Sequence, residues 1–147
     1  MVQVELLDIP FDPWTYLADW QGHRSQQSAR SGATAVFVGV MRDFNEGDDV
    51  REMFLEHYPG MTERQLEQLA TDAMQKWLLD DVLLVHRVGN ISPSQPIVLV
   101  AVWSAHRAAA FDACRQIMEV LKHTAPFWKR ETLTDGSVRW VENNTPG

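Results

Sequence analysis

The chain has 147 residues, 45% of them apolar and 22% charged, and a formal net charge of −7. This length predicts a single domain with one core, and the balanced composition excludes a mainly disordered chain. No run approaches about 18 uncharged apolar residues, so no membrane partner is expected. The acidic first residues do not resemble a secretion signal, and a single cysteine excludes a disulfide within the chain. These features predict a cytoplasmic protein.

The charge is distributed unevenly along the sequence. Residues 1–100 contain 7 Lys and Arg against 15 Asp and Glu, whereas residues 101–147 contain 6 against 5. The net negative charge argues against general nucleic-acid binding, which depends on neutralising phosphates. The more basic C-terminal third remains compatible with a small site for one anion.

The N-terminal half predicts three strands and a short helix. In chain order these are a strand over 2–7, a helix from the Asp12-Pro13 cap to about Trp20, and strands over 33–41 and 50–58. The run 33–41 is almost continuously apolar, which is typical of a strand buried on both faces. The polar segment 21–32 predicts a mobile loop, and the acidic segment 43–49 predicts a turn or flexible loop.

The C-terminal part alternates helices with pairs of strands. In chain order we expect a helix opened by a Thr62/Gln65 capping box, strands over 82–88 and 97–103, a helix from about His106 to Pro126, and a hairpin of 127–134 with 137–142. If Asp135-Gly136 is a two-residue turn, Lys129 lies opposite Glu142. This order predicts an α+β fold, in which helices pack on a mostly antiparallel sheet.

Familiar catalytic motifs do not occur in the sequence. There is no Walker loop, dinucleotide fingerprint, nucleophile elbow or His-Glu-x-x-His motif. The five histidines and one cysteine lack the spacing of zinc ligands, so no metal site is predicted. Cys114 lies on the apolar stripe of the last helix, which favours a core side chain over a nucleophile.

Basic residues concentrate where a strand, a helix and a hairpin follow one another. His106 and Arg107 lie at the expected helix start, where unpaired backbone N–H groups and the helix dipole favour an anion; the alternative is a solvated Arg107 and a His106 that caps its own helix. Lys122 ends that helix, where the dipole favours a cation without any functional role. Lys129 has two interpretations. It is one half of a cross-strand ion pair on the surface. Alternatively, apolar neighbours and the charge of Lys122 lower the pKa of its amine, which suits proton transfer or nucleophilic attack. Arg42 offers a guanidinium for a phosphate.

Five blocks of sequence resemble one known family, in the same order and at compatible spacing over about residues 32–142. The blocks are GVMR at 39–42, LEHYPGM at 55–61, HRVG at 86–89, SAHR at 104–107, and LK at 121–122 with APFWKRE at 125–131. They are similar to the large, catalytic subunit of molybdopterin synthase. The resemblance implies an α/β-hammerhead-type sandwich with a small β subdomain, as one domain over 1–147 in which 1–31 and 143–147 are peripheral.

The resemblance also implies a reaction and its partners. Sulfur arrives as a thiocarboxylate on the C-terminal glycine of a small ubiquitin-like subunit. Two sulfur atoms pass to cyclic pyranopterin monophosphate and form the dithiolene of molybdopterin. Two large subunits form a homodimer with one small subunit at each end, a heterotetramer that needs no metal or organic cofactor. Six tryptophans in so short a chain also favour an interface between subunits.

The resemblance assigns roles residue by residue. Lys122 and Lys129 match the catalytic lysines, with Lys122 beside the incoming thiocarboxylate. The positions that match substrate-binding residues are Val40, Met41, Arg42, His106, Arg107, Lys122, Lys129, Arg130 and Glu131, with Arg139 as a further candidate. Val40 stands where the family often has a basic residue, which removes one charge contact.

The residues alone leave two functions open. A sulfurtransferase acting on anionic substrates needs fixed cations and a lysine of lowered pKa. A non-catalytic adapter that binds a ubiquitin-like tail or another anion would use the same cations without turnover. The pattern of cations does not separate these functions, and the resemblance favours the enzyme.

Overall fold

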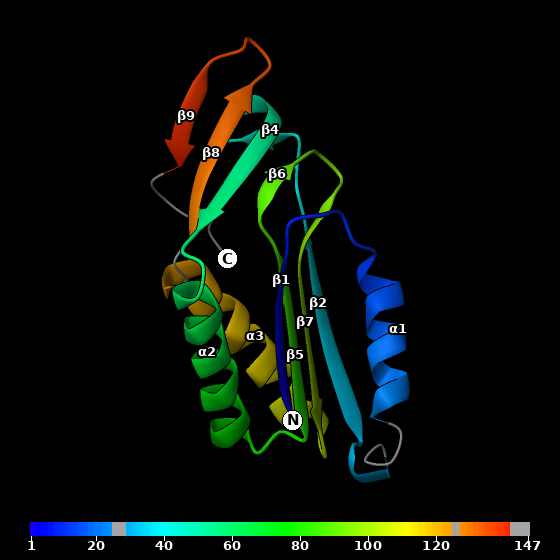
Figure 1. The fold of residues 1–147 in the computed structure, drawn as a ribbon. Coiled ribbons are helices and arrows are strands. Elements are labelled where there is room, and N and C mark those ends of the chain that lie inside the picture. The colour runs from blue at the N-terminus through cyan, green and yellow to red at the C-terminus, as the bar shows by residue number, and fades with distance from the viewer. Residues whose placement is uncertain (25–28, 125–126, 142–147) are drawn as a thin grey trace.

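Figure 1 shows the computed structural model of the chain, which describes residues 1–24, 29–124 and 127–141. In chain order the elements are β1 (Val2–Leu7), α1 (Pro13–His23), β2 (Ala33–Val40), β3 (Phe44–Asn45), β4 (Asp48–His57), α2 (Met61–Trp77), β5 (Asp81–Arg87), β6 (Gly89–Ile91), β7 (Pro96–Ser104), α3 (Arg107–Thr124), β8 (Phe127–Leu133) and β9 (Val138–Val141). The strands form two sheets and the helices pack on the larger one, which confirms the α+β class.

The larger sheet has the strand order β1-β5-β7-β2, with β1 parallel to β5 and the other pairs antiparallel. Helices α2 and α3 cover one face, and α1 lies on the other (Figure 1). Side chains alternate between the faces of a strand. Leu84 and Val100 therefore enter the core below α2 and α3, whereas Leu83 and Trp103 enter the core below α1.

The smaller sheet stands at one end of the larger one (Figure 1), with the order β3-β4-β8-β9 and with β6 also paired to β4. Met53, Leu55 and Ile91 form a separate core on one face of this sheet. The chain passes into the smaller sheet three times: from β2 into β3, from β5 into β6, and from α3 towards β8. The last turn of α3 therefore lies where the smaller sheet meets the end of the larger one.

Strand β2 is an edge strand, and the expectation that it is buried on both faces is wrong. It pairs with β7 alone among the described strands, and the residues Val36, Phe37 and Val40 are 37%, 40% and 47% exposed. The strands buried on both faces are the central β5 and β7. A continuous apolar run identifies a strand that is covered, but the cover can come from another subunit as well as from the same chain.

The β8–β9 hairpin has a different register from the one expected. Lys129 pairs with Val141 in the ladder, whereas the expected partner Glu142 lies outside the described residues. The loop has three residues instead of two, because the N–H of Leu133 donates to the carbonyl of Ser137 at 2.8 Å. Gly136 takes φ +87, which fits the left-handed position of such a loop. Within the described residues, the position directly opposite Lys129 is thus held by an apolar side chain and not by a carboxylate.

Three local boundaries also differ from expectation. Helix α1 runs to His23, so part of the expected loop 21–32 is helical, while residues 25–28 lie outside the described residues. Helix α2 is capped by Gly60, whose N–H donates to Glu63, and not by the expected Thr62/Gln65 box. The segment 43–49 forms the tight β3–β4 hairpin.

Within the part of the chain that the structure describes, no helix is long and apolar enough to cross a membrane.

Replacing Gly32 with alanine is expected to destabilise the fold. A Cβ at this position would lie 2.3 Å from the backbone oxygen of Ala105, next to the start of α3. We expect a loss of about 1–3 kcal/mol in the free energy of unfolding, measured by urea denaturation. The matched control is Gly22→Ala in α1, where a Cβ meets nothing within 4 Å. That change should be neutral or stabilise the fold by up to about 1 kcal/mol, and equal losses in both variants would contradict the prediction.

Candidate functional site

A hollow of about 530 Å³, counting its open mouth, lies where the smaller sheet meets the end of the larger one. Its walls come from the chain after β2, the β3–β4 hairpin, the end of α3 and one face of β8. The residues that line it are Val40, Met41, Arg42, Phe44, Asn45, Met53, Ile97, Lys122, Lys129, Glu131 and Val141. Six of the ten residues expected to bind substrate or act in catalysis therefore meet in one pocket.

Two lysines meet in this pocket because of how α3 leads into β8. Lys122 lies in the last turn of α3, where a cation is stabilised by the helix dipole. Lys129 lies on the face of β8 that also carries Glu131, two residues further along the strand. A hydrogen bond joins the two amines, raising the pKa of Lys122 and lowering that of Lys129.

The pocket makes Lys129 the more easily deprotonated of the two amines. Burial, followed by the positive charge of Lys122, lowers the pKa of Lys129 to about 8, with Glu131 opposing the change and Arg42 adding to it. Burial is also the main cause that lowers the pKa of Lys122, and Arg42 lowers it further. The arrangement suits a neutral Lys129 that accepts a hydrogen bond from the ammonium of Lys122.

Arg42 stands at the mouth of this pocket. Its guanidinium lies over the ring of Phe44, 4.8 Å from the centroid. The preceding Met41 is buried, and its backbone is fixed by hydrogen bonds with Gln95 and Ser94, both at 2.9 Å. These hydrogen bonds hold the backbone next to Arg42 in place. Val40, two residues before Arg42, has an exposed side chain.

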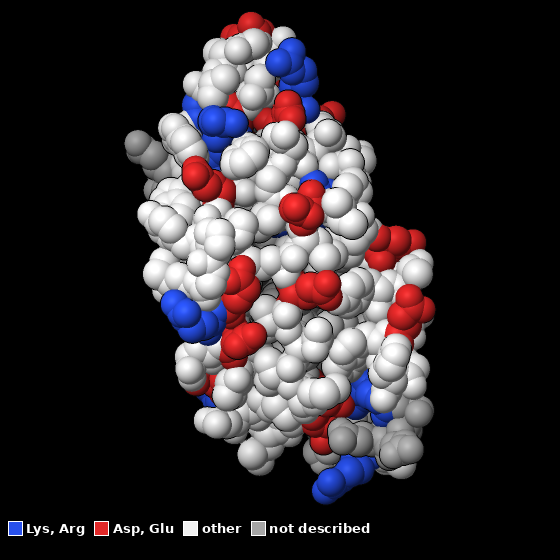
Figure 2. Space-filling model, viewed as in Figure 1, with Lys and Arg blue, Asp and Glu red and all other residues white. Residues whose placement is uncertain are grey.

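The positive charge here is local. The face shown in Figure 2 carries acidic side chains along most of its length, in keeping with the net charge of −7. Arg42, Lys122 and Lys129 therefore form a concentration of cations within an acidic protein. Such a pocket can hold an anion and supply a neutral amine beside it.

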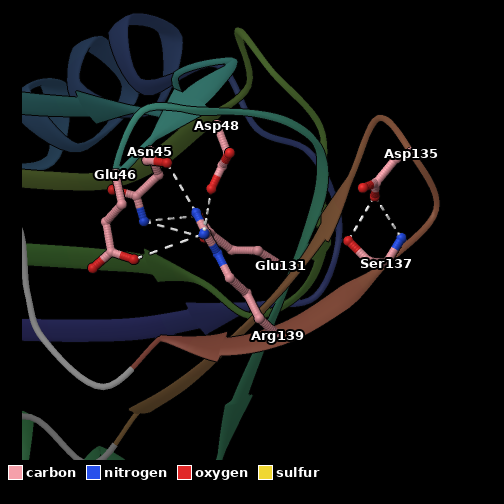
Figure 3. Close-up of polar contacts among 7 residues, drawn as sticks. All are labelled: Asn45, Glu46, Asp48, Glu131, Asp135, Ser137 and Arg139. Atoms are coloured by element: carbon pink, nitrogen blue, oxygen red, sulfur yellow. Dashed lines mark hydrogen bonds and ion pairs between the residues drawn. The ribbon is translucent and has the colours of Figure 1, made fainter.

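Arg139 is engaged by the protein itself (Figure 3). Its Nε donates to Glu131 at 3.1 Å, Nη1 pairs with Asp48 at 2.8 Å, and Nη2 donates to the carbonyl of Asn45 at 2.9 Å. The Asn45 side chain donates to both oxygens of Glu131, each at 3.1 Å. Glu131 is consequently buried and fixed, and Arg139 is committed to holding it rather than open to substrate.

The structure separates His106 and Arg107 from the lysines. Both are exposed at the start of α3, whereas Lys122 lies near its end. An 18-residue helix is about 27 Å long, so a single chain does not bring these residues together. Arg130 is also outside the pocket, since it lies on the other face of β8 with its guanidinium 5.0 Å from the ring centroid of Phe54. Within one chain, His106, Arg107 and Arg130 therefore do not line the pocket that holds Lys122 and Lys129.

Five pocket residues and one buried neighbour were not expected as functional residues; the five are Phe44, Asn45, Met53, Ile97 and Val141. Phe44 and Asn45 lie in the segment 43–49, whose sequence predicts a turn or loop and does not indicate that it lines a pocket. His86 is buried on β5, stacked on Phe127 with the ring centroids 4.3 Å apart. Its Nδ1 donates to the carbonyl of Arg87 at 2.7 Å. Burial lowers the pKa of His86 to about 4, so it is neutral beside the lysines.

Neither a thiol nor a metal ligand set contributes to this site. Cys114 is buried in the core of α3, and burial raises the pKa of its thiol to about 11, which confirms the core interpretation. Among residues 1–24, 29–124 and 127–141, no group of three or more His, Cys, Asp or Glu side chains could hold a metal ion.

The fold and the site define an α+β protein with a paired-lysine pocket suited to an anionic substrate. Residues 10–124 match the family model described as MoaE protein, and the chain belongs to this family. The molybdopterin synthase catalytic subunit of Pseudomonas aeruginosa is 53% identical over 116 residues, which cover 79% of this chain and 77% of that protein.

Solved structures agree with this family. The molybdopterin biosynthesis MoaE protein of Burkholderia ambifaria is 41% identical, with a TM-score of 0.80 over 100% of this chain and 93% of that one. The molybdopterin synthase of Staphylococcus aureus is 30% identical, with a TM-score of 0.82 over 97% and 99%.

Proposed function

We propose that this protein is the catalytic subunit of a molybdopterin synthase. It transfers sulfur from the C-terminal thiocarboxylate of a small ubiquitin-like subunit to cyclic pyranopterin monophosphate, forming the dithiolene of molybdopterin. The observation that carries the proposal is the pair of half-buried lysines beside Arg42 in a chain of the MoaE family. We place the enzyme in the cytoplasm as one domain over residues 1–147, with no metal or organic cofactor of its own.

The pocket provides the groups that this reaction needs. The thiocarboxylate and the phosphate are both anions, and the ammonium of Lys122 and the guanidinium of Arg42 offset their charge. Attack of sulfur on the pterin side chain requires proton transfers and release of a phosphate oxygen. The amine of Lys129, whose pKa is lowered to about 8, is neutral at a far lower pH than an ordinary lysine, and in that form it can accept a proton. Sulfur comes from the partner, so the buried Cys114 takes no part.

We also propose that two copies pair through β2, within a heterotetramer that has a small subunit at each end. The free edge of β2 exposes Val36, Phe37 and Val40, which a second copy would cover. A two-fold axis pairs two identical strands antiparallel, so the Ala33 end of one strand meets the Val40 end of the other. Since Ala33 pairs with Ser104, this brings the start of α3 of one copy towards the pocket of the other.

The same pairing gives His106 and Arg107 a role. Within one chain they lie a helix length from the lysines, but across the antiparallel β2 pair they approach the Arg42 side of the partner's pocket. Arg107 and Lys122 lie about 23 Å apart along α3, which is similar to the roughly 26 Å spanned by the eight residues of β2. We propose that His106 and Arg107 bind the anionic substrate in the pocket of the second copy.

Reconstitution tests the proposed function. The chain is mixed with a thiocarboxylated small subunit and cyclic pyranopterin monophosphate, and dithiolene formation is measured. We expect turnover that depends on the thiocarboxylate, with no product when the small subunit ends in an ordinary carboxylate. An adapter would instead bind both forms of the small subunit equally well and form no product, and that result would refute the enzyme.

A further inference from the structure

We propose that Arg139 is a positioning residue of the lysine pocket, which holds the Glu131 carboxylate in place and ties it to the β3–β4 hairpin. The inference deepens the proposed function, because the amines it concerns are those proposed to act in sulfur transfer. Three elements meet at Arg139: its own strand β9, the neighbouring strand β8, and the β3–β4 hairpin, which is far away in the sequence (Figure 3).

The guanidinium is used on all three of its nitrogens. Nε faces Glu131, while Nη1 faces Asp48 at 2.8 Å and Glu46 at 3.8 Å. Nη2 donates to the carbonyl of Asn45 at 2.9 Å. A planar fork with this many acceptors has a fixed orientation. Arg139 therefore acts as a clasp between the hairpin and Glu131, and not as a free cation for substrate.

The hydrogen bonds from Arg139 and Asn45 fix the position of the Glu131 carboxylate. One oxygen of Glu131 accepts from both Arg139 and Asn45, and the other accepts from Asn45, each at 3.1 Å. Among the ion pairs of residues 1–24, 29–124 and 127–141, Glu131 pairs with Arg139 and not with Lys129. Glu131 thus faces Lys129 without neutralising it directly, and Arg139 competes with Lys129 for the carboxylate.

The pKa of Lys129 therefore depends on opposing charges around its amine. Lys122 on α3 and Arg42 after β2 are the cations that face it, and Glu131 on its own strand is the anion. Neutral His86 on β5 lies beside Lys122 and Lys129 without adding charge. On the far side of Glu131, Arg139 is itself faced by Asp48 and Glu46 of the hairpin. If Arg139 is lost, Glu131 becomes free to pair with Lys129 and to stabilise its charged form.

The experiment measures the titration of Lys129 itself. The chain has only three lysines, Lys76, Lys122 and Lys129, so carbon NMR of protein labelled with ¹³C-lysine follows each amine without substrate or partner. In Arg139→Gln we expect the pKa of Lys129 to rise by about 0.5 or more, whereas Glu131→Gln should lower it. In the double variant the Arg139 change should have no further effect, because the carboxylate through which it acts is gone.

Two further variants control the experiment. Arg115→Gln removes the same charge from an exposed position on α3 and should leave Lys129 unchanged. Arg139→Lys keeps the charge without the three-way fork, and should give a smaller rise if Arg139→Gln proves too unstable to study. An unmoved titration in both Arg139 variants, or an equal rise in the Glu131→Gln background, would overturn the inference.

The outcomes separate this inference from the proposed function. A chain that forms dithiolene while Lys129 titrates unchanged in the Arg139 variants refutes the role of Arg139 alone. A chain in which the titrations shift as expected but no dithiolene forms supports Arg139 and refutes the sulfur-transfer reaction. In an active enzyme, Arg139→Gln should also move the pH profile of kcat towards higher pH with KM less affected, which a merely structural role would not do.

Discussion

Lys129→Ala is expected to lower the rate of dithiolene formation by about 100-fold or more while the chain remains folded. Its amine is the one in the pocket that loses its proton most easily, so its removal leaves no neutral base between Lys122 and Glu131. Lys129→Arg should not restore activity, because a guanidinium stays charged. Single-turnover assays with the thiocarboxylated partner measure the effect.

The role of Lys129 as a base also predicts whether the reaction rate rises or falls with pH. The pKa of Lys129 is lowered to about 8, so the amine is mostly protonated below pH 8 and mostly neutral above it. We expect the rate to rise with pH through about 8 and to lose this dependence in Lys129→Ala. An ordinary lysine would still be protonated at pH 9. A rate that falls through pH 8 in the parent chain would show that the protonated amine is the active form.

Lys76→Ala is the matched control for this substitution. Lys76 is exposed on α2, with its amine 5.1 Å from the ring centroid of Trp77, and lies outside the pocket. It is the third lysine of the chain, so the control removes the same charge and side chain without touching the site. Full activity in Lys129→Ala, or an equal loss in Lys76→Ala, would contradict the role of Lys129.

The sequence was a good guide to the lysine pair. Lys122 and Lys129 lie seven positions apart on either side of an apolar bend, and the end of a helix followed by a strand brings such residues close. Arg130 illustrates a rule that the sequence also contains, since side chains alternate along a strand and the neighbour of Lys129 must face the other way. The substrate-binding role that the resemblance gives Arg130 therefore stays a prediction that this single-chain pocket does not test.

Other parts of the site have no local signal. Asn45 reaches Glu131 because β3 folds back on β4, and the acidic composition of that segment says nothing of the contact. The partners of Arg139 are similarly set by the pairing of β8 with β4 and β9. Long-range pairing decides these contacts, and a sequence read element by element does not contain it.

Mixed dimers are expected to recover activity from two inactive chains. One chain carries Lys129→Ala, and the other carries both His106→Ala and Arg107→Ala. If each pocket combines its own lysines with His106 and Arg107 of the second copy, the mixed dimer has one intact site and one site with all the changes. Random exchange of equal amounts makes half of the dimers mixed, so about a quarter of the parent activity should return.

The alternative gives a different result from the same mixture. If His106 and Arg107 served the pocket of their own chain, each site of a mixed dimer would keep one defect, and no activity would return on mixing. Subunit exchange is followed separately by mass spectrometry of the mixed species, so that failure to exchange is not mistaken for failure to complement. Because Arg107 lies about 23 Å from Lys122 along α3, recovery would show that the active site is completed by the second copy.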